Sequence, residues 1–226
     1  MRQSNSNNIT AVPFMKKPEK YFSCNRSEMV KFVPQKSKIV LDVGCGAGDF
    51  GLFLKTTRNI EIWGFELCEN VANMASKKLD RVIIGNIENE INYLPLKYFD
   101  CIVFNDILEH LVSPWDVLKK IKYNLKDDGY IVASIPNVRF FNNIISLLIK
   151  REWKYEESGV LDKTHLRFFS ANTIIELFKS TGYKLLNIEG IHGIEFPIPF
   201  RLLNRLLLRM FEDMRYLDFA CVAKKM

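Results

Sequence analysis

The sequence has 226 residues and no apolar run that reaches the roughly 18 uncharged residues of a membrane-spanning helix. Its first eight residues are polar and lack the apolar core of a secretory signal, so we expect a cytoplasmic protein. Glycine and proline are scarce, at 11 and 8 residues, which excludes a collagen-like chain, and 48% apolar residues exclude a disordered one. The length predicts one folded domain over residues 1–226.

Cysteine is also sparse. The five cysteines are odd in number and widely spaced, and no Cys-x-x-Cys pair occurs. This pattern predicts reduced thiols rather than a disulfide framework, and it gives no indication of a zinc site.

The positive charge lacks a concentrated stripe. The net charge is +6, but lysine and arginine are dispersed and no nucleic-acid-binding motif is present. We therefore interpret the basic residues as solvated surface and expect no nucleic-acid partner.

Short apolar segments rich in β-branched residues alternate with helical patterns in the first part of the chain. The expected strands cover residues 38–43, 60–66, 81–86, 99–105 and 130–135. The expected helices cover residues 48–55, 69–78 and 114–125. Such alternation is typical of βαβ units, so the sequence predicts an α/β fold whose parallel sheet is buried on both faces.

The pattern changes after Pro136. We expect a helix over residues 140–151, then a polar and aromatic loop, then a helix over residues 171–179 that Ser170 caps. Two strands, 183–189 and 219–223, close the chain and enclose a helical stretch over residues 200–211.

Three glycines at alternate positions follow the first expected strand directly. Gly44, Gly46 and Gly48 lie between that strand and the next helix. Glycine permits a positive φ and close approach of a ligand to the backbone, and the helix beyond presents free N–H groups. Because open α/β sheets bind ligands at the carboxyl ends of their strands, the turn predicts a cofactor site.

Two cofactors compete for this turn. Gly46-x-Gly48-x-x-Gly51, with Glu66 at a suitable distance, formally matches the dinucleotide fingerprint of NAD enzymes. The segment from Asp42 to Gly48 also resembles the cofactor turn of class I methyltransferases, and this resemblance implies S-adenosylmethionine. That cofactor carries an ammonium and a sulfonium, which favour a carboxylate such as Asp42 beside the turn. A pyrophosphate disfavours that carboxylate, so we prefer S-adenosylmethionine.

The segment from Asp42 to Gly48 resembles the cofactor turn of class I S-adenosylmethionine-dependent methyltransferases. The resemblance implies a Rossmann-like seven-stranded sheet of order 3-2-1-4-5-7-6, with an antiparallel last strand and helical lid insertions. It implies that residues 21–136 form the cofactor-binding half, and that residues 137–226 supply acceptor-binding segments and closing strands.

The resemblance also implies roles for individual residues. Glu66 would bind the ribose hydroxyls, Asn86 would face the adenine edge, and the segment 105–111 would lie beneath the methionine moiety. The other cofactor contacts implied in this way are Tyr21, Arg26, Asp42, Gly44, Cys45, Gly46, Gly48, Leu67, Ile87 and Asn105.

Methyl transfer to a hydroxyl requires a base, because the hydroxyl proton is tightly held at neutral pH. His110 and His165 lie in expected site segments, and the ordinary histidine pKa of ~6.5 suits that role. We add Asp106 as a third candidate catalytic residue. The carboxylates of Asp106, Glu109 and Asp162 match no metal-binding motif, so we expect no metal.

Residues 161–170 resemble a segment of bacterial methyltransferases that act in surface polysaccharide and capsule synthesis. This resemblance implies O-methylation of a sugar or of a small group on a surface glycan. The alternatives are N-methylation of an amine or amino sugar, an NAD-dependent dehydrogenase, and a non-catalytic subunit that retains the cofactor fold. Methylation of RNA bases is disfavoured, because no Asn-Pro-Pro-Tyr-like motif follows the strand at 99–105.

The stretch 200–211 alternates leucine and arginine at helical spacing. Leu202, Leu206 and Met210 fall on one stripe of such a helix. We favour a helix packed on the edge of the sheet, and we keep two alternatives, a homodimer contact and a weak contact with an anionic membrane surface.

Overall fold

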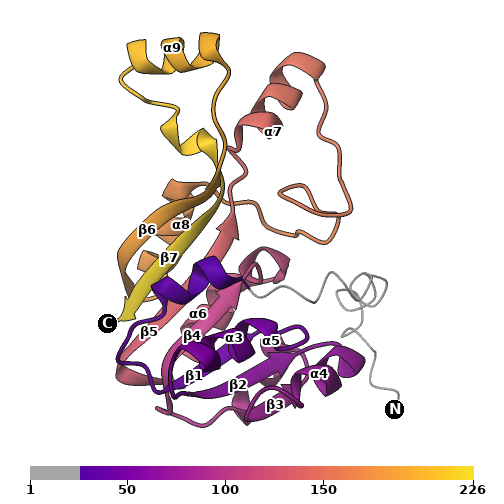
Figure 1. Cartoon of the computed structure of the whole chain (residues 1–226), viewed down its shortest axis with the longest axis vertical. Coiled ribbons are helices and arrows are strands. Elements are labelled where there is room, and N and C mark those ends of the chain that lie inside the picture. The colour runs from indigo at the N-terminus through magenta and orange to yellow at the C-terminus, as the bar shows by residue number, and fades with distance from the viewer. Residues whose placement is uncertain (1–25) are drawn as a thin grey trace.

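A single seven-stranded sheet forms the centre of the protein (Figure 1). The structure, a computed structural model, describes residues 26–226. The strands are β1 (Ile39–Val43), β2 (Glu61–Glu66), β3 (Arg81–Ile84), β4 (Phe99–Asn105), β5 (Leu125–Pro136), β6 (Tyr183–Gly193) and β7 (Tyr216–Lys225). Their order is β3-β2-β1-β4-β5-β7-β6, which confirms the predicted topology. The first five strands are parallel, and β7 runs antiparallel to both β5 and β6.

Helices cover both faces of the sheet because successive side chains of each strand point to opposite faces. The helices are α3 (Asp49–Thr57), α4 (Glu69–Ala75), α5 (Ile87–Glu90), α6 (Pro114–Ile121), α7 (Phe141–Ile145), α8 (Ala171–Ser180) and α9 (Ile198–Leu206). In β1, Leu41 and Val43 belong to one apolar cluster, to which α6 and α8 contribute, whereas Val40 belongs to another, to which α3 contributes. The sheet is therefore covered on both faces. Because the first five strands are parallel, their carboxyl ends lie together at one edge of the sheet.

Several element boundaries differ from the prediction, and two of these differences lie between α6 and α8. The helix expected over 114–125 ends at Ile121, and β5 begins already at Leu125. The first part of β5 is polar and lacks the apolar residues typical of a strand, so its sequence did not predict the extended conformation. The helix expected over 140–151 is divided into α7 and a π-helical turn, η4 (Ser146–Lys150). The predicted cap of α8 is confirmed, since Ser170 and Thr173 form a capping box.

A small aromatic cluster joins α7 and α9 at the end of the molecule where β5 and β6 finish (Figure 1). The ring centroids of Phe141 and Phe200 lie 4.7 Å apart, and those of Phe141 and Phe196 lie 5.3 Å apart. Helix α9 therefore packs against α7 rather than on the edge of the sheet, and our preferred interpretation of the stretch 200–211 is wrong. None of the helices in the described part of the chain is both long and apolar enough to cross a bilayer.

Candidate active site

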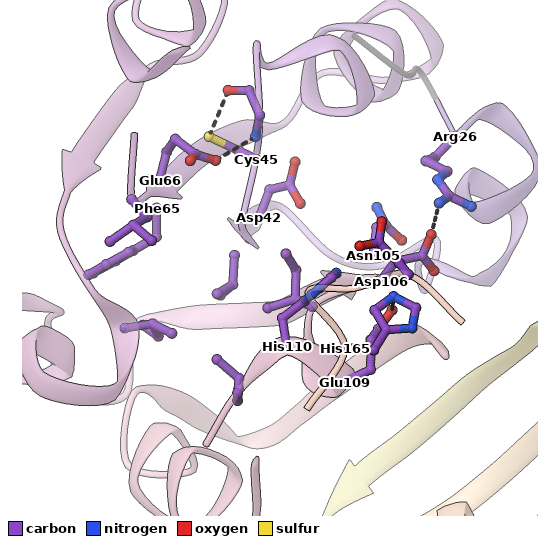
Figure 2. A pocket seen from close by; sticks show the side chains of 18 of the residues that line it. Arg26, Asp42, Cys45, Phe65, Glu66, Asn105, Asp106, Glu109, His110 and His165 are labelled. Atoms are coloured by element: carbon purple, nitrogen blue, oxygen red, sulfur yellow. Dashed lines mark hydrogen bonds and ion pairs between the residues drawn. The ribbon is translucent and has the colours of Figure 1, made fainter. Parts of the chain in front are cut away.

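A cavity of about 600 Å³ opens at the carboxyl ends of β1, β2 and β4 (Figure 2). The wall on the sheet side consists of the glycine turn, the end of β2 and the start of α5. The opposite wall consists of the segment after β4, parts of the loop 158–165, and residues near the start of β7. Segments far apart in sequence thus meet at the edge of the sheet where the sequence predicts the cofactor.

The glycine turn has the backbone conformation for which it needs glycine. The φ angles of Gly44, Gly46 and Gly48 are +70°, +53° and +81°. The N–H of Gly44 donates to the carbonyl oxygen of Phe65 at 2.7 Å, so the end of β2 holds the turn. Gly44 and Gly46 line the cavity.

Gly44 has a second constraint besides its φ. A Cβ atom at this position would lie 2.0 Å from Cδ1 of Ile107, a contact that requires movement. We expect Gly44→Ala to lower the free energy of unfolding by ~2–5 kcal/mol, from backbone strain and overpacking together. Urea titration measures this loss. Gly159→Ala is the matched control, because Gly159 has a φ of +87° but no atom within 4 Å of the place that a Cβ would occupy. Equal losses for both variants would contradict the proposed role of Ile107.

Gly48 and Cys45, two residues of the glycine turn predicted to contact the cofactor, also have packing roles. Gly48 does not line the cavity, and a Cβ atom there would lie 3.1 Å from the Cα of Ala75, so this glycine allows α3 to approach α4. Cys45 lines the cavity, but its Sγ lies only 2.6 Å from where a Cβ of Gly64 would be, so its side chain packs against β2.

Glu66, the last residue of β2, points its carboxylate into the cavity wall (Figure 2). Its two oxygens accept hydrogen bonds from the backbone N–H groups of Gly46 and Cys68, each at 2.9 Å. Burial raises the pKa of Glu66, although these two N–H groups act in the opposite direction. The carboxylate is therefore held rigidly and still has lone pairs available for a ligand.

Asp42 lies in β1, two residues before the first glycine, and only 2% of it is exposed. Burial, and secondarily the nearby Glu66, raise the pKa of Asp42 to about 8. A buried acid of this kind has its pKa lowered by a cation placed beside it.

Asn86 begins α5 at the cavity wall. Its Oδ1 accepts a hydrogen bond from the N–H of Glu88 at 2.9 Å, so the side chain caps the helix. Leu67 and Ile87 line the same part of the cavity. The predicted adenine-edge residues are thus brought together, and the capping bond fixes the orientation of Asn86.

Asn105 ends β4 and also lines the cavity. Neither its amide nitrogen nor its carbonyl oxygen has a hydrogen-bond partner among residues 26–226. A buried amide without partners is costly, so Asn105 indicates a ligand with both donor and acceptor groups.

Arg26 and Asp106 form an ion pair at one side of the cavity, as Figure 2 shows. The Asp106 carboxylate also accepts a hydrogen bond from the hydroxyl of Ser134. Asp106 is therefore occupied by two partners, which argues against its predicted catalytic role and favours a role in positioning Arg26. Tyr21, the other predicted contact of the cofactor carboxylate, lies outside the described residues.

His110 and His165 meet on the wall opposite Asp42 and Glu66 (Figure 2). Their ring centroids lie 4.6 Å apart, and both residues are buried. The Nδ1 atom of His110 lies 3.1 Å from the carbonyl oxygen of Thr164, and that of His165 lies 2.9 Å from the carbonyl oxygen of Val160. A carbonyl accepts only, so each Nδ1 carries a proton, and in the neutral form of each ring the lone pair is on Nε2.

Glu109 is the principal cavity residue to which the sequence analysis gave no role of its own. Its side chain is 1% exposed, and its Oε1 lies 3.9 Å from Nε2 of His165. Burial raises the pKa of Glu109 to about 8. Its position directly before His110 was the available signal, but nothing in the sequence shows that residue 165 approaches it.

His192 is a second missed residue. Its Nδ1 lies 2.7 Å from Oδ2 of the buried Asp218, and its Nε2 lies 3.5 Å from Oε1 of Glu28. Both His192 and Asp218 line the cavity. These strand-end residues come from β6 and β7, whose full lengths the sequence did not predict.

Comparison with known proteins assigns the family. The profile of the methyltransferase domain matches residues 19–188, which is most of the chain. The chain belongs to the methyltransferase domain family. A ubiquinone biosynthesis O-methyltransferase of Coxiella burnetii is 25% identical over 72% of this chain and 72% of its own. An uncharacterised protein of Methanocaldococcus jannaschii is 25% identical over 91% of this chain and 83% of its own.

Solved structures support the same fold. A methyltransferase of Archaeoglobus fulgidus, described as dependent on S-adenosylmethionine, superposes with a TM-score of 0.66 at 22% identity, over 92% of this chain and 97% of its own. A protein of Listeria monocytogenes, described as a putative enzyme of the same kind, superposes with a TM-score of 0.60 at 19% identity, over 89% of this chain and 98% of its own.

The methyltransferase uses S-adenosylmethionine, and its cavity fits that cofactor. The carboxylates of Glu66 and Asp42 suit a ribose diol and a cationic group, and the amide of Asn105, which has no hydrogen-bond partner in the described part of the chain, suits a polar ligand. The protein is thus an S-adenosylmethionine-dependent methyltransferase.

Proposed function

We propose that this methyltransferase methylates a hydroxyl oxygen of a small acceptor, with a sugar or a group attached to a glycan as the preferred acceptor class. The observation that carries the proposal is the position of His110 and His165 on the cavity wall opposite the cofactor carboxylates (Figure 2). When bound, S-adenosylmethionine supplies a methyl group already activated by its sulfonium. The chain therefore has to align the acceptor, exclude water and take up the acceptor's proton.

Two features favour oxygen over nitrogen. An amine only has to arrive neutral, whereas a hydroxyl needs a group that receives or loosens its proton. The two Nε2 lone pairs at this wall supply such a group, and the Coxiella burnetii relative is named as an O-methyltransferase. N-methylation of an amine or amino sugar remains the alternative.

The glycan acceptor depends only on the resemblance of residues 161–170 to enzymes of surface polysaccharide synthesis. This segment contributes Asp162 and His165 to the cavity lining, so it is available to contact an acceptor. The named relatives above give no support to a glycan, so the sugar stays a prediction.

Matched acceptor pairs test the proposal. Release of S-adenosylhomocysteine is measured with sugars, nucleotide sugars and phenols, each compared with the analogue in which an amine replaces the hydroxyl. We expect turnover with a hydroxyl acceptor and little with its amine analogue. Turnover confined to the amines would establish N-methylation instead.

We also propose that the end of the molecule formed by α9 and η4 contacts an anionic membrane surface. Leu206 and Leu208 are 78% and 91% exposed, and Leu148 and Ile149 in η4 are 68% and 74% exposed. Arginines and lysines alternate with these apolar side chains. The exposed basic residues are Lys150, Arg151, Arg201, Arg205 and Arg209. Apolar side chains interleaved with cations match a bilayer of anionic lipids better than a neutral protein surface.

Vesicle co-sedimentation checks this contact. We expect binding to phosphatidylglycerol vesicles and at least tenfold weaker binding of a Leu206→Ser, Leu208→Ser double variant, since each leucine loses ~1.5–3 kcal/mol of burial. Leu96→Ser is the control, because Leu96 is 74% exposed elsewhere on the surface. Equal binding to neutral phosphatidylcholine vesicles, or a homodimer that the double variant dissociates, would contradict the proposal.

A further inference from the structure

We propose that Glu109, His110 and His165 bind a divalent transition-metal ion such as Zn²⁺ or Mn²⁺. One potential ligand atom from each residue lies within 4.8 Å of the other two. Two imidazole nitrogens and one carboxylate oxygen form a donor set that such ions prefer, whereas Mg²⁺ and Ca²⁺ prefer oxygen ligands alone.

The separation of the ligand atoms is close to what an ion needs. Ligand bonds of about 2.1 Å place neighbouring donors roughly 3–3.5 Å apart. Nε2 of His165 and Oε1 of Glu109 are 3.9 Å apart, and all three ligand atoms lie within 4.8 Å of one another, so an ion would draw the ligands together by up to roughly an ångström. Side-chain rotation alone supplies a movement of that size.

The histidines are oriented as metal-binding histidines are. A ligating histidine usually donates its other ring N–H to a carbonyl or carboxylate, which fixes the tautomer and directs the remaining nitrogen at the ion. Both His110 and His165 have this arrangement, through the carbonyl oxygens of Thr164 and Val160. Asp162 in turn accepts hydrogen bonds from the N–H and the hydroxyl of Thr164, both at 2.8 Å.

Backbone hydrogen bonds tie the two ligand-bearing segments together. The N–H groups of Leu166 and Arg167 donate to the carbonyl oxygen of Glu109 at 2.8 and 2.9 Å. The loop that carries His165 is therefore fixed to the 3-10 turn η3 (Leu108–His110), which carries the other two ligands. A site assembled from two segments is preorganised by this connection.

The carboxylate of Glu109 supplies an independent indication. Both of its oxygens are buried, and neither has a hydrogen-bond partner among residues 26–226. A buried carboxylate that accepts no hydrogen bond is costly, and its contact with Nε2 of His165 at 3.9 Å is too long to be one. A cation between Glu109 and the two histidines removes this cost.

The ion would lie at the cavity wall, since all three residues line the cavity. With the ion bound, the Nε2 atoms of both histidines are ligands and do not accept a proton themselves. The cation instead lowers the pKa of a hydroxyl that coordinates it, which is what an oxygen acceptor requires. This role, but not the binding of the ion, rests on the proposed O-methylation.

Isothermal titration of ZnCl₂ and MnCl₂ into the EDTA-treated, untagged full-length chain tests the site. We expect one ion per chain and at least 100-fold weaker binding by the near-isosteric Glu109→Gln variant. Co²⁺ gives a second readout, through visible absorption bands that appear in the parent protein and not in Glu109→Gln. His192→Ala is the control, since His192 contacts carboxylates in the same cavity but lies outside the proposed site. Binding that is equally strong in Glu109→Gln, or absent from the parent protein, overturns the proposal.

The failure of this site and the failure of the proposed function give different results. If an ion binds through Glu109 but only amines are methylated, the metal site is supported and the proposed O-methylation is overturned. A hydroxyl acceptor that is methylated at an unchanged rate in EDTA leaves O-methylation standing and overturns the role of the ion.

Discussion

Replacement of Asp42 by asparagine should stabilise the cofactor-free protein and weaken its binding of S-adenosylmethionine. The pKa of Asp42 is raised to about 8 in the folded state by burial and by Glu66. The unfolded chain loses this proton near its ordinary pKa of ~3.9, so the folded state becomes relatively less stable as pH rises from there to about 8. At ~1.4 kcal/mol per pH unit, the cost at pH 7 has an upper bound of about 4 kcal/mol.

The asparagine variant avoids this cost because it cannot ionise in either state. We expect its melting temperature without cofactor to exceed that of the parent protein at pH 7, on the order of 5–10 °C, with a smaller difference at pH 5. Its affinity for S-adenosylmethionine should fall roughly ten- to a hundredfold, because a charge-assisted interaction is lost. Thermal scans and titration calorimetry measure the two effects.

Asp49→Asn is the matched control. Asp49 begins α3, lies outside the cavity and pairs with Lys78 at the surface, so its replacement should change both quantities little. An Asp42→Asn variant that is destabilised without cofactor would contradict the expected cost of burying Asp42. A variant that binds S-adenosylmethionine as well as the parent protein would show that the cofactor's cationic part lies elsewhere.

Replacement of His165 by alanine should lower the rate of methyl transfer by ~10²–10⁴-fold, the range expected when a group that handles a proton is removed. Affinity for S-adenosylmethionine should stay near that of the parent protein, because His165 lies on the wall opposite Asp42 and Glu66 (Figure 2). Single-turnover rates with an accepted hydroxyl substrate, together with cofactor titrations, separate the two quantities.

Lys163→Ala controls for damage to the loop. Lys163 lies two residues away, is exposed, and its side chain pairs with Glu157 at the surface. We expect this variant to keep its rate and its melting temperature. If His165→Ala lost affinity for the cofactor and kept its affinity for the acceptor, His165 would be assigned to cofactor binding instead.

The cavity wall that carries the glycine turn could be predicted from sequence because its determinants are local. The glycine turn, Asp42 and Glu66 each follow or end a strand whose apolar pattern is visible, and parallel strands bring their carboxyl ends to one edge. The strand order followed from the family resemblance rather than from the spacing of residues.

The cavity wall that carries Glu109, His110 and His165 depends on contacts that no local pattern contains. Glu109 and His165 are brought together by a loop whose backbone N–H groups donate to the carbonyl oxygen of Glu109. Such bonds use main-chain atoms only, so the types of side chain in the sequence do not predict them. The location of α9 was missed for a similar reason. The leucine stripe in its sequence is compatible with packing on the edge of a sheet. Only the aromatic contacts with Phe141 show that the helix packs against α7 instead.

The backbone connection between the loop and Glu109 has a consequence for acceptor selectivity. The bonds from residues 166 and 167 to Glu109 use main-chain atoms only, and Leu166 is 42% exposed. Almost any non-proline side chain at position 166 is compatible with the same attachment. The loop can therefore diversify in sequence, and be altered by design, while His165 keeps its place beside Glu109.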